Sequence, residues 1–335
     1  MKIMVDAFGG DNAPIDVIKG CLLALETYSD IELFLSGNED TLRKIATENN
    51  INISKITIVD AEDVISVDED PKEICRSKSS CSMAVGLKAL KSGAVDAFVS
   101  AGSTGALVVG SSVLVGRIKG VKRAALAPVL HTDNGCFMIL DAGANLDCRP
   151  EMFVQFGIMG SVYVKRVLGI SNPRVGLANV GIEPSKGTEA HRCGYELLSN
   201  CQCINFVGNM EARDMFLGKC DVIVCDGLSG NMMLKTAEGT SKFLIGILKE
   251  IFTRSIFTKL AALSLKNQIK RVKKTVDYRE YGGAILLGIS KPVIKAHGSS
   301  DANAFKNAIN QARMCVREKI IDEMSKNISG SMGDE

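Results

Sequence analysis

Apolar residues follow two patterns that alternate along the chain. Short runs rich in Val, Ile and Leu are typical of buried strands, whereas apolar residues spaced three and four positions apart indicate helices with one buried face. The helical spacing occurs at 15–27, 82–91, 152–167 and 302–324. The strand pattern occurs at 2–5, 31–35, 56–59, 97–99, 125–129, 137–140, 175–178, 204–207, 222–224 and 293–295.

The alternation itself predicts the fold class. Strands that take turns with helices build strand–helix–strand units and a mostly parallel sheet. We therefore expect an α/β protein with a three-layer, doubly wound sheet. No low-complexity linker divides the sequence, and no repeat of about 20 to 50 residues indicates a solenoid. A single domain over residues 1–335 is the simplest expectation.

A broad apolar stripe at helical spacing lies between residues 243 and 257, and it continues after a polar break. It predicts a protruding helical hairpin at about 240–275. Residues 241–274 contain nine Lys or Arg and one Glu. Two interpretations stay open: a hairpin packed against the core or a dimer partner, or a basic surface for an anionic membrane or an acidic protein. The basic cluster comprises Lys266, Lys270, Arg271, Lys273 and Lys274.

Three predicted strands end in an Asp followed by Gly-rich polar residues, at 5–12, 140–145 and 225–231. Ligands of open α/β sheets bind outside the carboxyl ends of the strands, so we expect these loops to converge on one site. Ordinary turn formation explains any one loop alone. The candidate site residues in these loops are Asp6, Gly9, Gly10, Asn12, Asn145, Asp226 and Asn231.

Two further segments could hold phosphate. The loop 100–106 contributes Gly102 and Gly105, whose backbone amides could face an anion. At 293–300, Lys295, His297 and Ser299 lie around one glycine, and they combine an ammonium, an imidazole and a hydroxyl. A helix N-cap is the alternative reading of the serines. Because neither the loop 100–106 nor the loop 229–231 carries a Walker or GxGxxG pattern, a nucleotide is not indicated.

Lys186 stands at a predicted helix start, in the segment 184–189. A cation there opposes the helix dipole unless an anion balances it. The conflict makes Lys186 a candidate functional residue.

Composition places the chain among soluble globular proteins, with 46% hydrophobic and 23% charged residues. Eleven cysteines without a secretion signal indicate reduced thiols in the cytosol. The cysteines lack paired CxxC spacing, so we expect neither a disulfide framework nor a metal site. No apolar run approaches the roughly 18 residues of a membrane span.

Seven ordered motifs give the chain a family resemblance. They are VDAFGGDNAP, SAGSTGA, DAGAN, EPSKGTE, FVGNMEARD, CDGLSGN followed by LK, and DYREYGGAILLG with IKAHGSS. Over its whole length the chain resembles the PlsX family of acyl-ACP:phosphate acyltransferases. The resemblance implies a fold similar to isocitrate and isopropylmalate dehydrogenases and to phosphate acetyltransferases. It also implies a homodimer that uses no metal, no nucleotide and no other cofactor.

The implied reaction is attack of inorganic phosphate on the thioester of acyl-ACP, which yields acyl phosphate for phospholipid synthesis. Lys186, His297 and Asp226 would be catalytic, and Lys295, Asn231 and Ser299 would bind phosphate with the Gly-rich loops. Acyl carrier protein would be the donor, and a membrane glycerol-3-phosphate acyltransferase would accept the product. The protein would then be cytoplasmic and peripherally associated with the membrane, without a nucleic-acid partner.

Two other functions remain open at this point. A phosphate acetyltransferase-like enzyme would use acyl-CoA instead of acyl-ACP. A membrane-associated regulator without catalysis would make no acyl phosphate from either donor.

Overall fold

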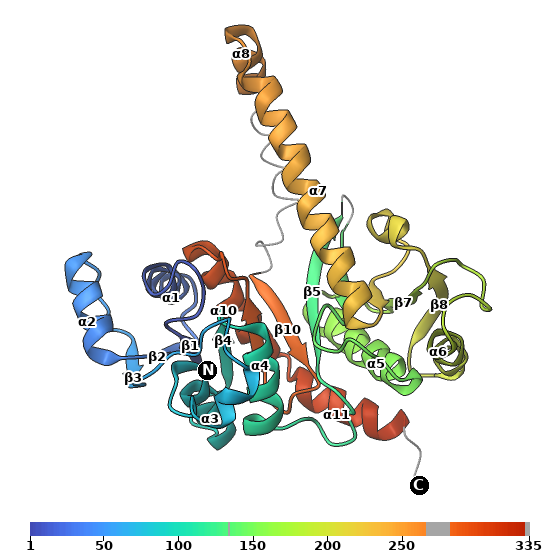
Figure 1. Cartoon of the computed structure of the whole chain (residues 1–335), viewed down its shortest axis with the longest axis horizontal. Helices are drawn as coiled ribbons and strands as arrows, with labels where there is room; N and C mark the ends of the chain where they lie inside the picture. Colours follow the sequence, from blue (N-terminus) through green and yellow to red (C-terminus); the bar gives the residue numbers. More distant parts are fainter. Residues whose placement is uncertain (133–134, 266–281, 332–335) are drawn as a thin grey trace.

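The computed structural model describes residues 1–132, 135–265 and 282–331. In this part of the chain, eleven strands form one sheet in the order β3-β2-β1-β4-β11-β10-β5-β6-β9-β7-β8 (Figure 1). The strands are β1 Lys2–Asp6, β2 Glu32–Ser36, β3 Thr57–Val59, β4 Ala97–Ser100, β5 Ala125–Thr132, β6 Gly135–Leu140, β7 Arg174–Ala178, β8 Asn205–Met210, β9 Val222–Val224, β10 Gly283–Leu287 and β11 Val293–Ala296.

The strands are connected mainly by helices. The α-helices are α1 Ile15–Thr27, α2 Glu39–Glu48, α3 Ser82–Ser92, α4 Thr104–Gly110, α5 Pro150–Val167, α6 Glu189–Asn200, α7 Gly227–Thr253, α8 Ile256–Ser264, α10 Ala302–Arg317 and α11 Ile320–Ser331. Shorter turns of helix are η1 Pro71–Cys75, η2 Ser111–Val115 and η3 Ala212–Leu217.

All ten predicted strands are present, and β10 is the strand that the sequence pattern missed. Its five residues lie between Gly282 and Gly288. The predicted helix 302–324 is two helices, because Lys319 adopts a positive φ of 51° between α10 and α11. Buried Ile320 and Met324 continue the apolar spacing across this break, which hides it in the sequence.

Strand direction reverses in the middle of the sheet. β10 is antiparallel to both β11 and β5, and β5 is antiparallel to β6, whereas all other neighbouring pairs of this sheet are parallel. The carboxyl ends of β1, β4 and β11 therefore point opposite to those of β6, β9 and β7. The predicted mostly parallel sheet is confirmed, but the loops that follow its two halves leave the sheet in opposite directions.

Alternating side chains separate the two faces of the sheet. Ile3 and Val5 belong to one large core with α1, α5, α6, α10 and α11, whereas Met4 between them packs with α3 and α4. On the far half of the sheet, Ile139 packs with residues of α7. One face is thus covered along its length. The other face is covered by α3 and α4 at one end and by α7 at the other.

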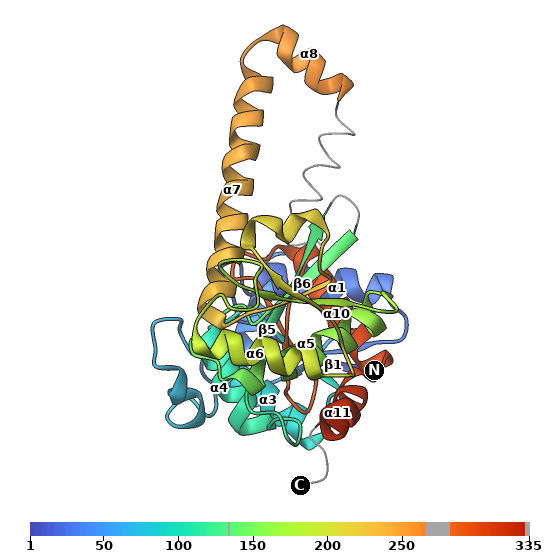
Figure 2. The ribbon, with the colours of Figure 1, turned by 90° about the vertical axis from the view of Figure 1, so that its right-hand side faces the viewer.

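α7 begins within the body of the protein, and its C-terminal part projects from it with α8 at the tip (Figures 1 and 2). The protrusion was predicted from about residue 240, but the helix itself starts earlier, at Gly227. The basic cluster Lys266, Lys270, Arg271, Lys273 and Lys274 lies outside the described residues. None of the helices in the described ranges combines the length and the apolar character needed to cross a membrane.

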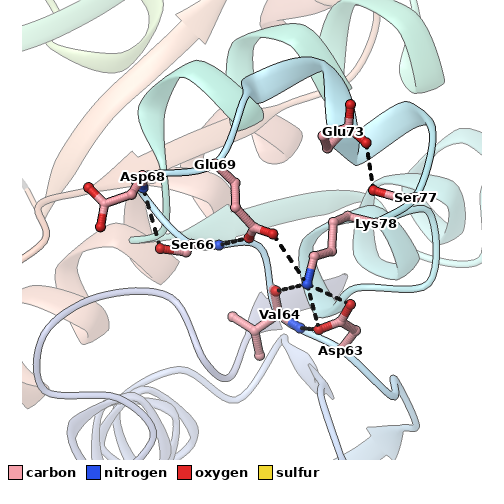
Figure 3. Close-up of polar contacts among 8 residues, drawn as sticks. All are labelled: Asp63, Val64, Ser66, Asp68, Glu69, Glu73, Ser77 and Lys78. Carbon is pink, nitrogen blue, oxygen red and sulfur yellow. Dashed lines mark hydrogen bonds and ion pairs between the residues drawn. The ribbon is translucent and has the colours of Figure 1, made fainter.

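A polar network fixes the segment between β3 and α3 (Figure 3). The Lys78 Nζ atom lies 2.8 Å from Asp63 Oδ2 and 3.4 Å from Glu69 Oε1, and it donates to the Val64 carbonyl. Within this segment η1 packs against α4: Pro71 lies where a side chain on Gly105 would be placed. The network thereby holds η1 in place against the start of α4.

Gly230, in the first turn of α7, permits a close approach to the loop after β6. A Cβ atom at Gly230 would lie 1.9 Å from the Asp141 carbonyl oxygen, whereas one at Gly239 on the same helix would meet nothing within 4 Å. We expect Gly230→Ala to lower the free energy of unfolding by about 3 kcal/mol or more, because backbone must move. The matched control Gly239→Ala should raise it by about 0.5–1 kcal/mol. Urea unfolding measures both, and equal effects would contradict the packing described.

Candidate functional site

A cavity of about 290 Å³ opens over the central strands, where α3, α4 and α7 leave the sheet uncovered. Its floor is formed by β5 and β10, and it is bordered by the ends of β11 and β6 and by α7. Both apolar and polar groups line it. The lining residues are Thr104, Leu126, Pro128, Val129, Leu130, Ala142, Gly143, Asn231, Leu234, Lys235, Glu238, Gly282, Gly283, Ala284, Lys295, Ala296 and His297.

Lys295 is the buried cation of this cavity. In β11, Ile294 and Ala296 face the large core, so the alternation of the strand turns Lys295 toward the open face. Its Nζ atom donates to the carbonyls of Ala101 and Ala296, at 3.2 and 2.6 Å. Burial lowers the pKa of Lys295 to about 8, against the opposing effect of the Asp6 charge.

Asp6 braces the loops behind Lys295. Its carboxylate accepts hydrogen bonds from the hydroxyls of Ser82 and Ser100, both at 2.7 Å, and from the Phe8 amide. Burial raises the pKa of Asp6, while these hydrogen bonds and the Lys295 charge act in the other direction. Asp6 therefore orders the cavity wall through its neighbours and does not line the cavity.

The predicted glycines of the first loop serve close backbone contacts. A Cβ atom on Gly9 would lie 2.6 Å from the Gly102 nitrogen, and one on Gly10, whose φ is 100°, would lie 2.8 Å from the Gly298 carbonyl oxygen. Asn12 Nδ2 donates to the Ser300 carbonyl at 3.2 Å. The loops after β1, β4 and β11 are thus held together. The Gly102 amide itself donates to Ser100 Oγ at 3.0 Å.

His297 is held in one orientation by Ser299. The Ser299 amide donates to His297 Nδ1 at 3.2 Å, and Ser299 Oγ lies 2.9 Å from the same nitrogen. Because Nδ1 accepts the amide hydrogen, a neutral ring carries its proton on Nε2. Burial lowers the pKa of His297, and Lys235 and Lys295 add to this effect while Glu238 opposes it. Burial therefore favours the neutral imidazole.

The opposite wall is the first part of α7. Asn231 and Lys235 line the cavity four residues apart, and Asn231 lies beside Gly143 of the loop after β6. Sequence reasoning selected Asn231 but missed Lys235 and Glu238. Their spacing from Asn231, four and seven residues along a helix, is the signal that would have found them.

Asn145 supports this wall from behind. Its side-chain amide donates to the Ala124 carbonyl and to Asp141 Oδ2, at 2.8 and 2.9 Å. The backbone carbonyl of Asn145 accepts a hydrogen bond from the Gly227 amide. Asp141 also accepts from the amides of Leu126 and Asn145. Burial raises the pKa of Asp141, against these hydrogen bonds. The predicted ligand Asn145 is therefore placed as a brace between the loop and α7.

Asp226 lies at a second cavity of about 560 Å³ on the other side of the start of α7, and Lys186 lies on the loop beside this cavity. Asp226 lines it and caps α7 by accepting from the Ser229 amide and hydroxyl, each at 2.8 Å. Lys186 is exposed on the adjoining loop, next to the lining residue Gly187. His191 Nε2 lies 4.0 Å from Asp226 Oδ2.

The expected convergence of three loops is therefore partial. The loops after β1 and β11 meet directly, since the Asp11 amide donates to the Gly298 carbonyl at 2.8 Å. The loops after β6 and β9 meet each other at Gly227, and they line the cavity opposite His297 of the loop after β11, whereas no residue of the loop after β1 lines it. Within the described ranges, no cluster of three His, Cys, Asp or Glu side chains is arranged to hold a metal ion.

The family model described as fatty acid synthesis protein matches residues 1–323. The chain belongs to this family. A phosphate acyltransferase from Caldanaerobacter subterraneus subsp. tengcongensis is 48% identical over 335 residues, covering 100% of this chain and 99% of the relative. A phosphate acyltransferase from Clostridium acetobutylicum is 46% identical over 328 residues, covering 98% and 99%. As a member of this family the chain is an enzyme, a transferase.

Solved structures of low sequence identity share the fold. A phosphotransacetylase from Streptococcus pyogenes has a TM-score of 0.62 at 17% identity, with 96% of this chain and 94% of that chain covered. A phosphotransacetylase from Staphylococcus aureus has a TM-score of 0.59 at 15% identity, with 94% of each chain covered. The predicted fold class is confirmed by this likeness and by the observed sheet.

Proposed function

We propose that this family member transfers the acyl group of acyl-ACP to inorganic phosphate and forms acyl phosphate for phospholipid synthesis. The observation that carries the proposal is the mixed polar and apolar lining of the smaller cavity. Lys295, His297 and Asn231 offer cationic and hydrogen-bonding groups, whereas Leu126, Leu130 and Leu234 offer an apolar surface. Phosphate and an acyl thioester need these two surfaces side by side.

Phosphate would lie between β11 and α7. Lys295 supplies the buried charge, and the amide of Asn231 supplies a neutral donor from the opposite wall. Ser299 acts through His297, since its amide and hydroxyl both lie at Nδ1. Such fixed donors stabilise charge without the reorganisation that water requires.

The reaction follows from this placement. A phosphate oxygen attacks the thioester carbonyl carbon, and the carbonyl oxygen becomes an oxyanion to which His297 Nε2–H donates. Collapse of the tetrahedral intermediate breaks the C–S bond and releases the carrier thiolate, which takes a proton from solvent. Acyl phosphate remains. Holding both reactants in attack geometry supplies much of the rate enhancement.

Cysteines beside the α7 start are poorly suited as covalent nucleophiles. Burial raises the pKa of Cys148 to about 12, and it raises the pKa of Cys225 well above its ordinary value. The thiolate is the reactive form of cysteine. An acyl-enzyme intermediate on either of these cysteines is therefore disfavoured, which is consistent with direct attack by phosphate.

The projecting part of α7 and α8 would bring the site to an anionic membrane, where an acyl phosphate could pass to a glycerol-3-phosphate acyltransferase. Phe243 is 68% and Phe257 84% exposed, and Leu244, Ile251 and Ile256 are exposed with them. Apolar side chains on an exposed helix can insert at the bilayer interface, with nearby cations attracting the lipid head groups. The homodimer implied by the family resemblance remains part of this proposal.

The first test is product formation by the purified protein. With inorganic phosphate and palmitoyl-ACP we expect phosphate-dependent release of free thiol and an acyl phosphate trapped by hydroxylamine. His297→Ala should lower kcat about 10²- to 10³-fold, the usual effect of losing one oxyanion donor. Product from palmitoyl-CoA alone would favour the phosphate acetyltransferase-like alternative, and no product from either donor would leave a regulator.

Lys186→Ala is the comparison variant, because Lys186 borders the second cavity. If it lowers kcat as much as His297→Ala does, the second cavity takes part in the chemistry.

The pH dependence of kcat/KM for phosphate should follow the ionisation of Lys295. The ammonium is charged below its pKa of about 8 and neutral above it, so kcat/KM for phosphate should fall as pH rises past about 8. Lys295→Arg keeps its charge and should move this decline to higher pH. The ionisation of phosphate is common to both proteins and cancels in the comparison. Identical alkaline limbs would contradict a role for the Lys295 charge.

If the exposed apolar side chains contact the membrane, their removal should weaken binding to phospholipid vesicles. The double variant Phe243→Ser with Phe257→Ser should bind vesicles of anionic phospholipid at least about tenfold more weakly, because the lost apolar burial exceeds 1.4 kcal/mol. Co-sedimentation measures this. Lys2→Ser, on the exposed start of β1, serves as the control, and unchanged binding in the double variant would exclude the helical tip from the membrane contact.

A further inference from the structure

Four residues of α7 face the smaller cavity at helical spacing: Asn231, Leu234, Lys235 and Glu238. Two of them form an ion pair. Lys235 Nζ lies 2.8 Å from Glu238 Oε2, three residues further along the helix. The cavity therefore contains a carboxylate on the wall opposite Lys295, in the region where an anionic substrate is proposed to bind.

Burial of the two side chains is unequal. The Glu238 side chain is 9% exposed, whereas that of Lys235 is 53% exposed. A buried carboxylate is costly unless nearby cations or donors compensate it. Glu238 has that compensation: Lys235 contacts it, and its charge also acts on the His297 ring, as do the charges of Lys235 and Lys295. The charges of Lys235, Glu238 and Lys295 therefore all act on the His297 ring.

A carboxylate and a phosphate offer the same kind of partner to an ammonium, namely anionic oxygens that accept charge-assisted hydrogen bonds. Resting on the function proposed above, we propose that Lys235 is a further phosphate ligand and that Glu238 holds its ammonium at the cavity until phosphate takes the place of the carboxylate. Lys235 suits this exchange because its long, half-exposed side chain can turn between the two acceptors. The Glu238 carboxylate also repels phosphate. Phosphate binding therefore requires the Lys235 ammonium to leave Glu238.

The alternative is an ordinary ion pair between residues three apart on a helix. Such pairs stabilise a helix slightly and have no effect on a substrate. The two readings differ in one respect: only the exchange gives Lys235 and Glu238 opposite effects on phosphate affinity.

The experiment compares four variants of the full-length protein. Lys235→Met and Glu238→Gln remove one charge each, Lys235→Arg keeps the charge, and Lys249→Met removes an exposed charge further along α7 as the matched control. Binding of inorganic phosphate is measured by calorimetry, and KM values for phosphate and for palmitoyl-ACP are measured separately. Thermal unfolding shows whether each variant is folded.

Lys235→Met should raise both the dissociation constant and KM for phosphate about tenfold or more, the effect of one lost charge-assisted hydrogen bond, and leave KM for palmitoyl-ACP within about twofold. Lys235→Arg should stay within about threefold of the original protein. Glu238→Gln should tighten phosphate binding by roughly two- to tenfold, since a repulsive charge is gone and Lys235 is released. Lys249→Met should change neither constant.

Two results would overturn the proposal. The first is phosphate affinity in Lys235→Met equal to that in Lys249→Met, which leaves a structural ion pair. The second is weaker phosphate binding in Glu238→Gln, which makes Glu238 a support and not a competitor. Failure of the proposed reaction is recognised separately, because the original protein would then form no acyl phosphate from palmitoyl-ACP.

Discussion

Three consecutive antiparallel pairings, β11–β10, β10–β5 and β5–β6, determine how the two halves of the sheet present their loops. The strands before β10 and the strands after β5 point in opposite directions, so their carboxyl ends cannot share one edge. They meet instead over the uncovered middle of one face, where β5 and β10 form the floor of the cavity. The other face is continuously packed, and it holds both halves in register around that opening.

Two buried carboxylates make the walls of the opening rigid. Asp6 ties the loop after β1 to Ser82 and Ser100, and Asp141 ties the loop after β6 to Leu126 and Asn145. Burial raises the pKa of each carboxyl group, and the hydrogen bonds from these donors act in the other direction. The side chains that face the cavity therefore come from positions next to fixed backbone, as a preorganised anion site requires.

The two sides of α7 have different chemical character. Asn231, Leu234, Lys235 and Glu238 face one cavity, and Asp226, Leu228 and Met233 face the other. One helix thus separates the Lys295–His297 cluster from the loop that carries Lys186. Its beginning is packed so closely against the loop after β6 that Gly230 has no room for a side chain.

The sequence by itself determined the fold class, ten strands, the apolar stripe of the projecting helix and the cluster of Lys295, His297 and Ser299, because each rests on local spacing. Tertiary structure decided the rest. Strand direction is a property of pairing, so the reversal between β11 and β6 and the separation of Lys186 and Asp226 from His297 could not be read from spacing. Lys235 and Glu238 look like any solvated helical pair until the open sheet face gives them a cavity to line.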